Sequence, residues 1–208
     1  MVRYPSHKKH FGIFFSSTLR KETSTSTLTN TIYLLAKHPE ALQKAKKEVE
    51  EVLEGKEPDG DNLAQLPYCF AVVKESMRLM PAVTTAIPRV AKRDTVLLGY
   101  NVKEGTMISL DMAVAHFDEK HWPEPYEFRP ERFLDGKPKM AYFPFGWGPQ
   151  SCLGRKFALT QIQLVLAKLL QTFEGWQLPP AFQYNSKVFS ISMRPRDGLP
   201  VNFVKKTK

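Results

Sequence analysis

A single cysteine near the end of the chain has the surroundings of a metal ligand. Cys152 lies between Gly148 and Gly154, directly before a long apolar segment that predicts a helix, and Phe145 precedes it by seven residues. The N–H groups and the dipole of a helix N-terminus stabilise a thiolate, and flanking glycines let a flat ligand approach the backbone. These surroundings would suit a thiolate that binds a metal, and further motifs have to decide. The alternative is a small buried hydrophobic residue, the commonest role of a free cysteine.

Two charged motifs precede this cysteine. Glu75 and Arg78 are three residues apart on a predicted helix, so their side chains share one face. The simple alternative is a surface ion pair worth about 0.2–0.5 kcal/mol. Further along, the sequence Phe-Arg-Pro-Glu-Arg-Phe at residues 128–133 follows a stretch rich in proline and aromatic residues.

These motifs, in this order, resemble the cytochrome P-450 family, whose cysteine loop is written F-x-x-G-x-R-x-C-x-G and follows an E-x-x-R helix and a P-E-R-F loop. The positions that match the cysteine loop are Phe145, Gly148, Cys152 and Gly154. Gln150 stands where the family has a basic residue. An amide can donate a hydrogen bond to a haem propionate but supplies no charge, so we expect weaker anchoring of haem.

The resemblance implies a role for each matched residue. Cys152 is expected to be the axial ligand of haem iron, inside a cofactor-binding loop that contains Phe145, Gly148, Gln150 and Gly154. Arg89 is expected to pair with a haem propionate, because its planar fork can grip a carboxylate; the alternative is an ordinary surface charge.

A buried charge network is implied as well. Glu75, Arg78 and Arg132 are expected to hold the proline-rich stretch behind the haem, and removing one member of a buried charge cluster damages folding. His116 and Trp122 match family positions before the P-E-R-F loop, and we interpret both as structural.

Glu22 and Thr23 resemble the acid and alcohol pair of the family's long central helix. The resemblance implies that the threonine hydroxyl helps to deliver protons during dioxygen activation and that the acid supports it. The alternative is that this Ser/Thr-rich stretch caps the N-terminus of a helix.

Hydrophobic periodicity and the positions of proline and glycine predict the remaining elements. Helices are predicted at Thr23–Lys37, Pro39–Gly55, Tyr68–Met80 and Leu153–Phe173, the last buried on several sides. Strands are predicted at Thr95–Leu98 and Met107–Asp111, joined through a hairpin region, and at Lys187–Met193 and Pro200–Val204, joined by a turn at Asp197-Gly198. Residues 117–150 are predicted to be a long ordered loop. The fold class is mainly α with small β-sheets, an incomplete C-terminal part of the cytochrome P-450 fold.

The resemblance divides the chain into an unmatched segment, residues 1–21, and a partial cytochrome P-450 domain, residues 22–208. Leu19 and Arg20 stand where the family has small residues before the acid and alcohol pair. We therefore expect residues 1–21 not to continue the family's central helix, and to be sequence joined by truncation, alternative splicing or a faulty gene model.

Composition is that of a globular protein, with 42% hydrophobic and 25% charged residues. Two cysteines form neither a disulfide framework nor a zinc set, and Cys69 is predicted to lie in the core. The net charge of +9 is spread along the chain without a nucleic-acid motif, so we interpret it as a solvated surface, with membrane-surface association as the functional alternative. No segment approaches the ~20 apolar residues of a membrane span.

The function that the resemblance implies is a haem-dependent monooxygenase. Haem b (iron protoporphyrin IX) would be the cofactor, a partner reductase would pass on electrons from NADPH, and the substrate would be organic and lipophilic. The resemblance implies a place on the endoplasmic reticulum membrane, where eukaryotic members are usually held by an N-terminal anchor; this sequence does not show that anchor and leaves the location of the chain open. One alternative is a non-catalytic truncated fragment with weak or no haem binding. Another is a basic helical binding module, which only the charge supports.

Overall fold

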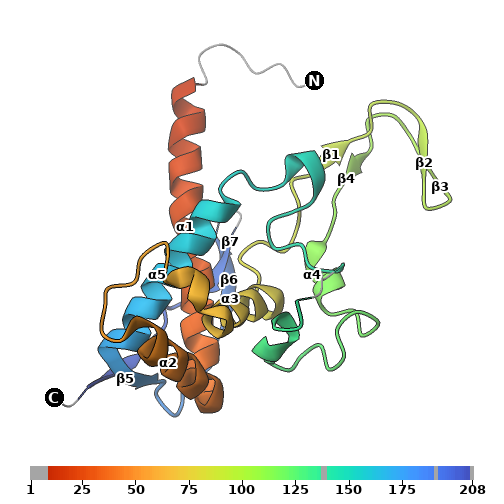
Figure 1. Ribbon diagram of the computed structural model, residues 1–208. Coiled ribbons are helices and arrows are strands. Elements are labelled where there is room, and N and C mark those ends of the chain that lie inside the picture. Colours follow the sequence, from red (N-terminus) through yellow and green to blue (C-terminus); the bar gives the residue numbers. More distant parts are fainter. Residues whose placement is uncertain (1–8, 137–139, 190–191, 207–208) are drawn as a thin grey trace.

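The computed structural model describes residues 9–136, 140–189 and 192–206. Helices account for 44% of the chain and strands for 15%, so the predicted class of a mainly helical protein with small sheets is confirmed. Figure 1 shows α1, α2, α3 and α5 gathered around one another, whereas β1 to β4 and α4 lie on the opposite side of the molecule. The chain is thus built from a helical body and a mostly irregular half.

Helix α1 spans Lys9–Lys37 and begins well before the predicted start at Thr23. The hydroxyls of Thr27 and Thr31 donate to the carbonyls four residues earlier, at 3.0 and 2.8 Å, as side chains in a helix interior do. The capping role considered for this Ser/Thr-rich stretch is therefore wrong. The boundary predicted between residues 21 and 22 falls inside this helix, and residues 1–8 lie outside the described residues.

Three further helices follow the predicted positions closely. Helix α2 spans Pro39–Leu53, α3 spans Pro67–Leu79 and α5 spans Arg155–Thr172. Proline starts α2 and α3, where its missing N–H costs no hydrogen bond. The Glu48 carboxylate on α2 accepts the N–H groups of Tyr68 and Cys69 at 2.7 and 2.8 Å, so one helix caps the N-terminus of the next.

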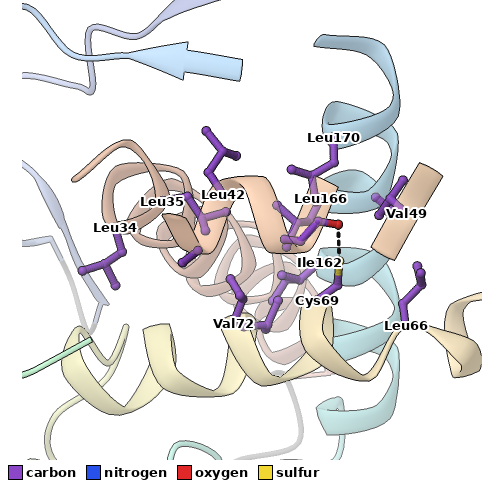
Figure 2. Packing of buried hydrophobic residues seen from close by; sticks show 14 of the residues in the cluster. Leu34, Leu35, Leu42, Val49, Leu66, Cys69, Val72, Ile162, Leu166 and Leu170 are labelled. Carbon is purple, nitrogen blue, oxygen red and sulfur yellow. Dashed lines mark hydrogen bonds between the residues drawn. The ribbon is translucent and has the colours of Figure 1, made fainter. Parts of the chain in front are cut away.

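The hydrophobic core lies where these four helices meet, as Figure 2 shows. Leu35, Val49, Val72 and Leu166, one from each helix, are fully buried. Cys69 is buried among them, as predicted, and its Sγ lies 3.6 Å from the Ala45 carbonyl. Side chains from all four helices thus form one continuous core.

The strands form antiparallel pairs that differ from the predicted hairpins. Strand β2 (Thr95–Leu97) pairs with β3 (Tyr100–Val102), and β4 (Met107–Ile108) pairs with β1 (Arg89–Val90). The two strands predicted in this region therefore exist but do not pair with each other. A turn at Leu98-Gly99, where both residues have positive φ, closes the first pair instead.

The predicted C-terminal hairpin is wrong in its pairing. Strand β6 (Ser186–Phe189) pairs with β7 (Ser192–Pro195), and β8 (Asn202–Lys205) pairs with β5 (Phe173–Gln177). Residues 190–191 of the predicted strand lie outside the described residues. Aromatic packing explains the partner of β8, because the Phe203 ring lies 4.7 Å from that of Phe173 and 5.7 Å from that of Trp176.

The described parts of the predicted loop, residues 117–136 and 140–150, are largely irregular, as predicted. They contain two short 3₁₀ helices, η3 (Pro130–Phe133) and η4 (Gly148–Gln150), and follow the one-turn helix α4 (Met112–His116). A further 3₁₀ turn, η2 (Leu63–Gln65), joins α2 to α3. Such a long irregular stretch stays ordered only if side chains fix it to the helices.

The core assignment predicts a contrast between two leucines of α5. Leu166→Ala should lower the free energy of unfolding by about 2–5 kcal/mol, because it leaves a cavity in a fully buried site. Leu164→Ala, at a side chain that is 39% exposed, is the matched control and should cost far less. Urea denaturation of the two variants measures both, and equal losses would contradict the packing of α5.

Candidate functional site

Residues 143–154, here called the cysteine loop, form a closed turn before α5. The Cys152 N–H donates to the Phe145 carbonyl at 2.8 Å, and the Gly146 N–H donates to the Phe143 carbonyl at 3.0 Å. Gly146 has φ +75° and Gly148 has φ +68°, in the left-handed region that glycine adopts without strain. The two glycines thus allow the chain to turn back and bring Phe145 beside Cys152.

The thiol of Cys152 is exposed, three residues before α5 begins at Arg155. The role of a buried hydrophobic residue, considered from the sequence, is therefore wrong. Gly154 is the N-cap residue of α5, and a side chain added there would lie 3.9 Å from Sγ. Unpaired N–H groups and the helix dipole favour negative charge at this end of α5, which suits a thiolate.

Three apolar side chains of the cysteine loop and the start of α5 face solvent. Trp147 is 73% exposed and Phe157 is 60% exposed, while Leu153 is fully exposed. Leu153 directly precedes α5, and Phe157 lies in its first turn. The expectation that this helix is buried on several sides fails at Phe157. An exposed apolar surface of this kind marks a site for an apolar ligand or partner.

Glu75, Arg78 and Arg132, here called the charge network, are brought together as predicted. Both side chains of the Glu75–Arg78 pair are fully buried, and Arg78 donates to the two carboxylate oxygens of Glu75 at 2.8 Å each. Arg132 donates to Glu75 Oε1 at 3.2 Å, and the Arg129 N–H donates to the same oxygen at 3.0 Å. The surface ion pair considered from the sequence is therefore wrong.

The two arginines use their other N–H groups to hold the irregular stretch. Arg78 donates to the carbonyls of His116, Pro125 and Glu127 at 2.8, 2.6 and 3.1 Å. Arg132 donates to two further carbonyls, those of Pro123 and Glu124. Burial lowers the pKa of the Arg132 guanidinium, and Glu75 beside it opposes that shift. The charge network therefore fixes residues 116–132 onto α3.

An aromatic cluster connects this region to the cysteine loop. The indole N–H of Trp122 lies 3.1 and 3.2 Å from the carbonyls of Ala115 and Ala141, and the Tyr142 hydroxyl donates to the Lys74 carbonyl at 2.9 Å. Trp122 is buried, in keeping with the structural role predicted for it. The cluster places Tyr142, one residue before the cysteine loop, firmly against α3.

The other predicted site residues lie on separate elements. Arg89 is exposed on β1, and Gln150 is exposed at the end of η4. Glu22 and Thr23 lie inside α1, where the Glu22 Oε2 atom is buried and, among the described residues, has no hydrogen-bond partner. The structure thus joins the predicted charge network directly, while the remaining roles stay predictions.

Sequence reasoning missed the contact between His116 and the cysteine loop. The Phe143 N–H donates to His116 Nε2 at 2.9 Å. No local pattern announces this bond, because its partners are 27 residues apart and one of them is a backbone group. The match of His116 to a family position was the only available signal.

The fold and the cysteine loop together define a class of protein. The family model described as Cytochrome P450 matches residues 11–197, so its match starts earlier than the predicted residue 22. The chain belongs to the cytochrome P450 family. Its mainly helical fold with small sheets is a part of the fold of that family.

Curated relatives carry the same family name. The chain is similar to Cytochrome P450 3A5 of Homo sapiens, at 41% identity over 156 residues that cover 73% of this chain and 31% of that protein. Cytochrome P450 3A19 of Capra hircus aegagrus is 39% identical over 157 residues, covering 73% of this chain and 72% of that protein. Cytochrome P450 3A16 of Mus musculus is 40% identical over 157 residues, covering 31% of its length. The matched region thus spans about a third of the human and mouse relatives.

Within the described ranges, none of the helices combines the length and the apolar character that crossing a membrane requires.

The charge network predicts a large difference between two glutamates. Glu75→Gln should lower the free energy of unfolding by about 3–5 kcal/mol, because it leaves Arg78 and Arg132 buried without their anion. Glu131→Gln is the matched control, since Glu131 forms an exposed pair with Lys44 that is worth at most about 1 kcal/mol. Chemical denaturation measures both, and a Glu75→Gln chain as stable as the control would refute the buried network.

Proposed function

We propose that this chain provides the haem-binding part of a monooxygenase that inserts one atom of dioxygen into an organic, lipophilic substrate. The observation that carries the proposal is the exposed Cys152 thiol in a glycine-containing loop at the N-terminus of α5. A flat apolar macrocycle would cover the exposed apolar side chains of Trp147, Leu153 and Phe157, which belong to the same loop and to the start of α5. Membership of the cytochrome P450 family supports the same cofactor.

The cysteine loop would hold haem b through the Cys152 thiolate. When bound, such a haem supplies the activation of dioxygen, which a thiolate ligand favours by donating electron density. The hydrogen bond from the Cys152 N–H to the Phe145 carbonyl keeps the thiolate in place. Gly148 has φ +68°, a backbone conformation that glycine adopts without strain, and it has no side chain that could keep a flat ligand away from the backbone. The guanidinium of Arg155 lies 5.8 Å from the Phe145 ring centroid and adds positive charge beside the loop.

Two side chains would bind the carboxylate edge of the cofactor. Arg89 is exposed on β1 and carries the charge and the fork that a propionate prefers. Gln150 is exposed on η4 and would donate a neutral hydrogen bond in place of a charged one. This amide also favours the second candidate function, a non-catalytic fragment that binds haem weakly.

Glu22 and Thr23 would handle protons. The buried Oε2 atom of Glu22, which has no hydrogen-bond partner within the described residues, would accept a hydrogen bond from a water molecule and so orient it for proton transfer. Thr23, its neighbour on α1, would help to deliver protons through its hydroxyl. Electrons would come from NADPH through a partner reductase. This chain would be located at the endoplasmic reticulum membrane, where its net charge of +9 favours contact with an anionic surface.

The spectrum of the haem-reconstituted chain tests the proposal. After reduction and exposure to carbon monoxide, we expect a strongly red-shifted Soret band, because a thiolate donates electron density to iron. Cys152→Ala should abolish the shift, while Cys69→Ala, which changes a buried core cysteine, should keep it. A spectrum that is identical in the Cys152→Ala chain would exclude thiolate ligation. Absence of haem uptake would favour the non-catalytic fragment.

The amide at position 150 generates a second prediction. Gln150→Arg should slow haem loss by about fivefold, because a charged hydrogen bond is roughly 1 kcal/mol stronger than a neutral one. Transfer of haem to apomyoglobin measures the rate. Gln161→Arg, on α5, controls for the added charge and should leave the rate unchanged. Equal rates in all three chains would remove Gln150 from the cofactor site.

A further inference from the structure

His116 is a buried ionisable side chain that the proposed chemistry does not use. It ends α4 and is 1% exposed. The Asp111 carboxylate caps α4 by accepting the Ala113 N–H at 3.0 Å, so the short helix has a fixed beginning. The backbone carbonyl of His116 accepts from Arg78 at 2.8 Å. The main chain of this residue is therefore tied to the charge network.

The ring of the same residue reaches the cysteine loop. Its Nε2 accepts the Phe143 N–H at 2.9 Å, and the ring lies 5.6 Å from that of Tyr142. The Phe143 carbonyl in turn accepts the Gly146 N–H at 3.0 Å, next to the Phe145 carbonyl that accepts from Cys152 at 2.8 Å. A chain of hydrogen bonds thus connects Glu75, through Arg78 and His116, to the cysteine loop.

We propose that His116 is a positioning residue, whose neutral imidazole fixes the start of the cysteine loop to the charge network by accepting the Phe143 N–H. The importance of this loop for haem rests on the proposed function, whereas the contact itself does not. Only an unprotonated Nε2 can accept a hydrogen bond, so the neutral ring carries its proton on Nδ1. That atom is buried and has no hydrogen-bond partner among the residues that the structure describes.

The surroundings oppose a charge on this ring. Burial lowers the pKa of His116 from 6.5 to about 4; the backbone of Arg78 opposes this shift and the Arg78 charge adds to it. On α3 the charged groups are Arg78 and its partner Glu75, and the loop contributes the Tyr142 ring. Arg155 of α5 is the further charge that acts on Tyr142.

The sign of the pH dependence follows from this lowered pKa. Between pH 6.5 and about 4 an opened loop takes up a proton on His116, whereas the closed loop does not. Opening therefore becomes easier as the pH falls through this window, and above it the contact is fully present. Near pH 5.5 the loop should open about tenfold more readily than near pH 7.5.

Amide hydrogen exchange of the haem-free chain tests the proposal. The measured quantity is the protection factor of residues 143–152, corrected for the intrinsic effect of pH. Protection should fall about tenfold from about pH 7.5 to about pH 5.5 in the unmodified chain, while α2 keeps its protection. His121→Phe is the matched control, because this histidine is exposed in the same irregular stretch. It should show the same fall as the unmodified chain.

Two variants separate the acceptor from the ring. His116→Gln places an amide oxygen within reach of Phe143 N–H and cannot titrate, so protection should persist at both pH values. His116→Phe keeps the ring without an acceptor, and protection should fall about tenfold at about pH 7.5. A pH-independent unmodified loop, or a His116→Gln chain that keeps the pH dependence, overturns the proposal, and both tests hold even where His116→Phe fails to fold. A protected loop that takes up no haem contradicts the proposed function alone.

Discussion

The buried carboxylate of Glu75 is the interaction on which the irregular half of the molecule depends. Two arginines and one backbone N–H donate to it, and the arginines then donate to the carbonyls of residues 116–127. A charge that is buried without partners is strongly destabilising, so the removal of any one of these three side chains destabilises the fold. Residues 116–132 thereby gain a defined path although most of them belong to no regular helix or strand.

That path determines where the thiol lies. Tyr142 packs against Trp122, and its hydroxyl donates a hydrogen bond to a carbonyl of α3. The ring of His116 accepts a hydrogen bond from the Phe143 N–H. Two glycines then turn the chain so that the Cys152 N–H donates to the Phe145 carbonyl. Helix α5 then places its N-terminal dipole at the cysteine and its buried side in the core. Stability and chemistry are therefore linked, because the helices that bury Leu166 also carry the loop that presents the thiol.

The sequence predicted those features that depend on near neighbours. Proline at the start of α2 and the periodic apolar residues of α5 were sufficient for those two helices. The short motifs around Glu75 and Cys152 indicated the family, and the resemblance to that family implied the charge network. Features set by distant partners were not predictable. The pairing of β8 with β5 depends on Phe203 packing against Trp176, and the cap of α3 is a glutamate from α2. The histidine contact likewise involves a backbone N–H, which carries no sequence signal.

The central claim is that the loop held by this network presents a thiolate to haem iron. X-ray absorption at the iron edge of the reconstituted chain measures the ligand atom itself. We predict one sulfur neighbour of iron, which disappears in Cys152→Ala and persists in Cys69→Ala. An iron surrounded only by nitrogen and oxygen in the unmodified chain would contradict the claim, and the cysteine loop would then be a structural feature without its metal chemistry.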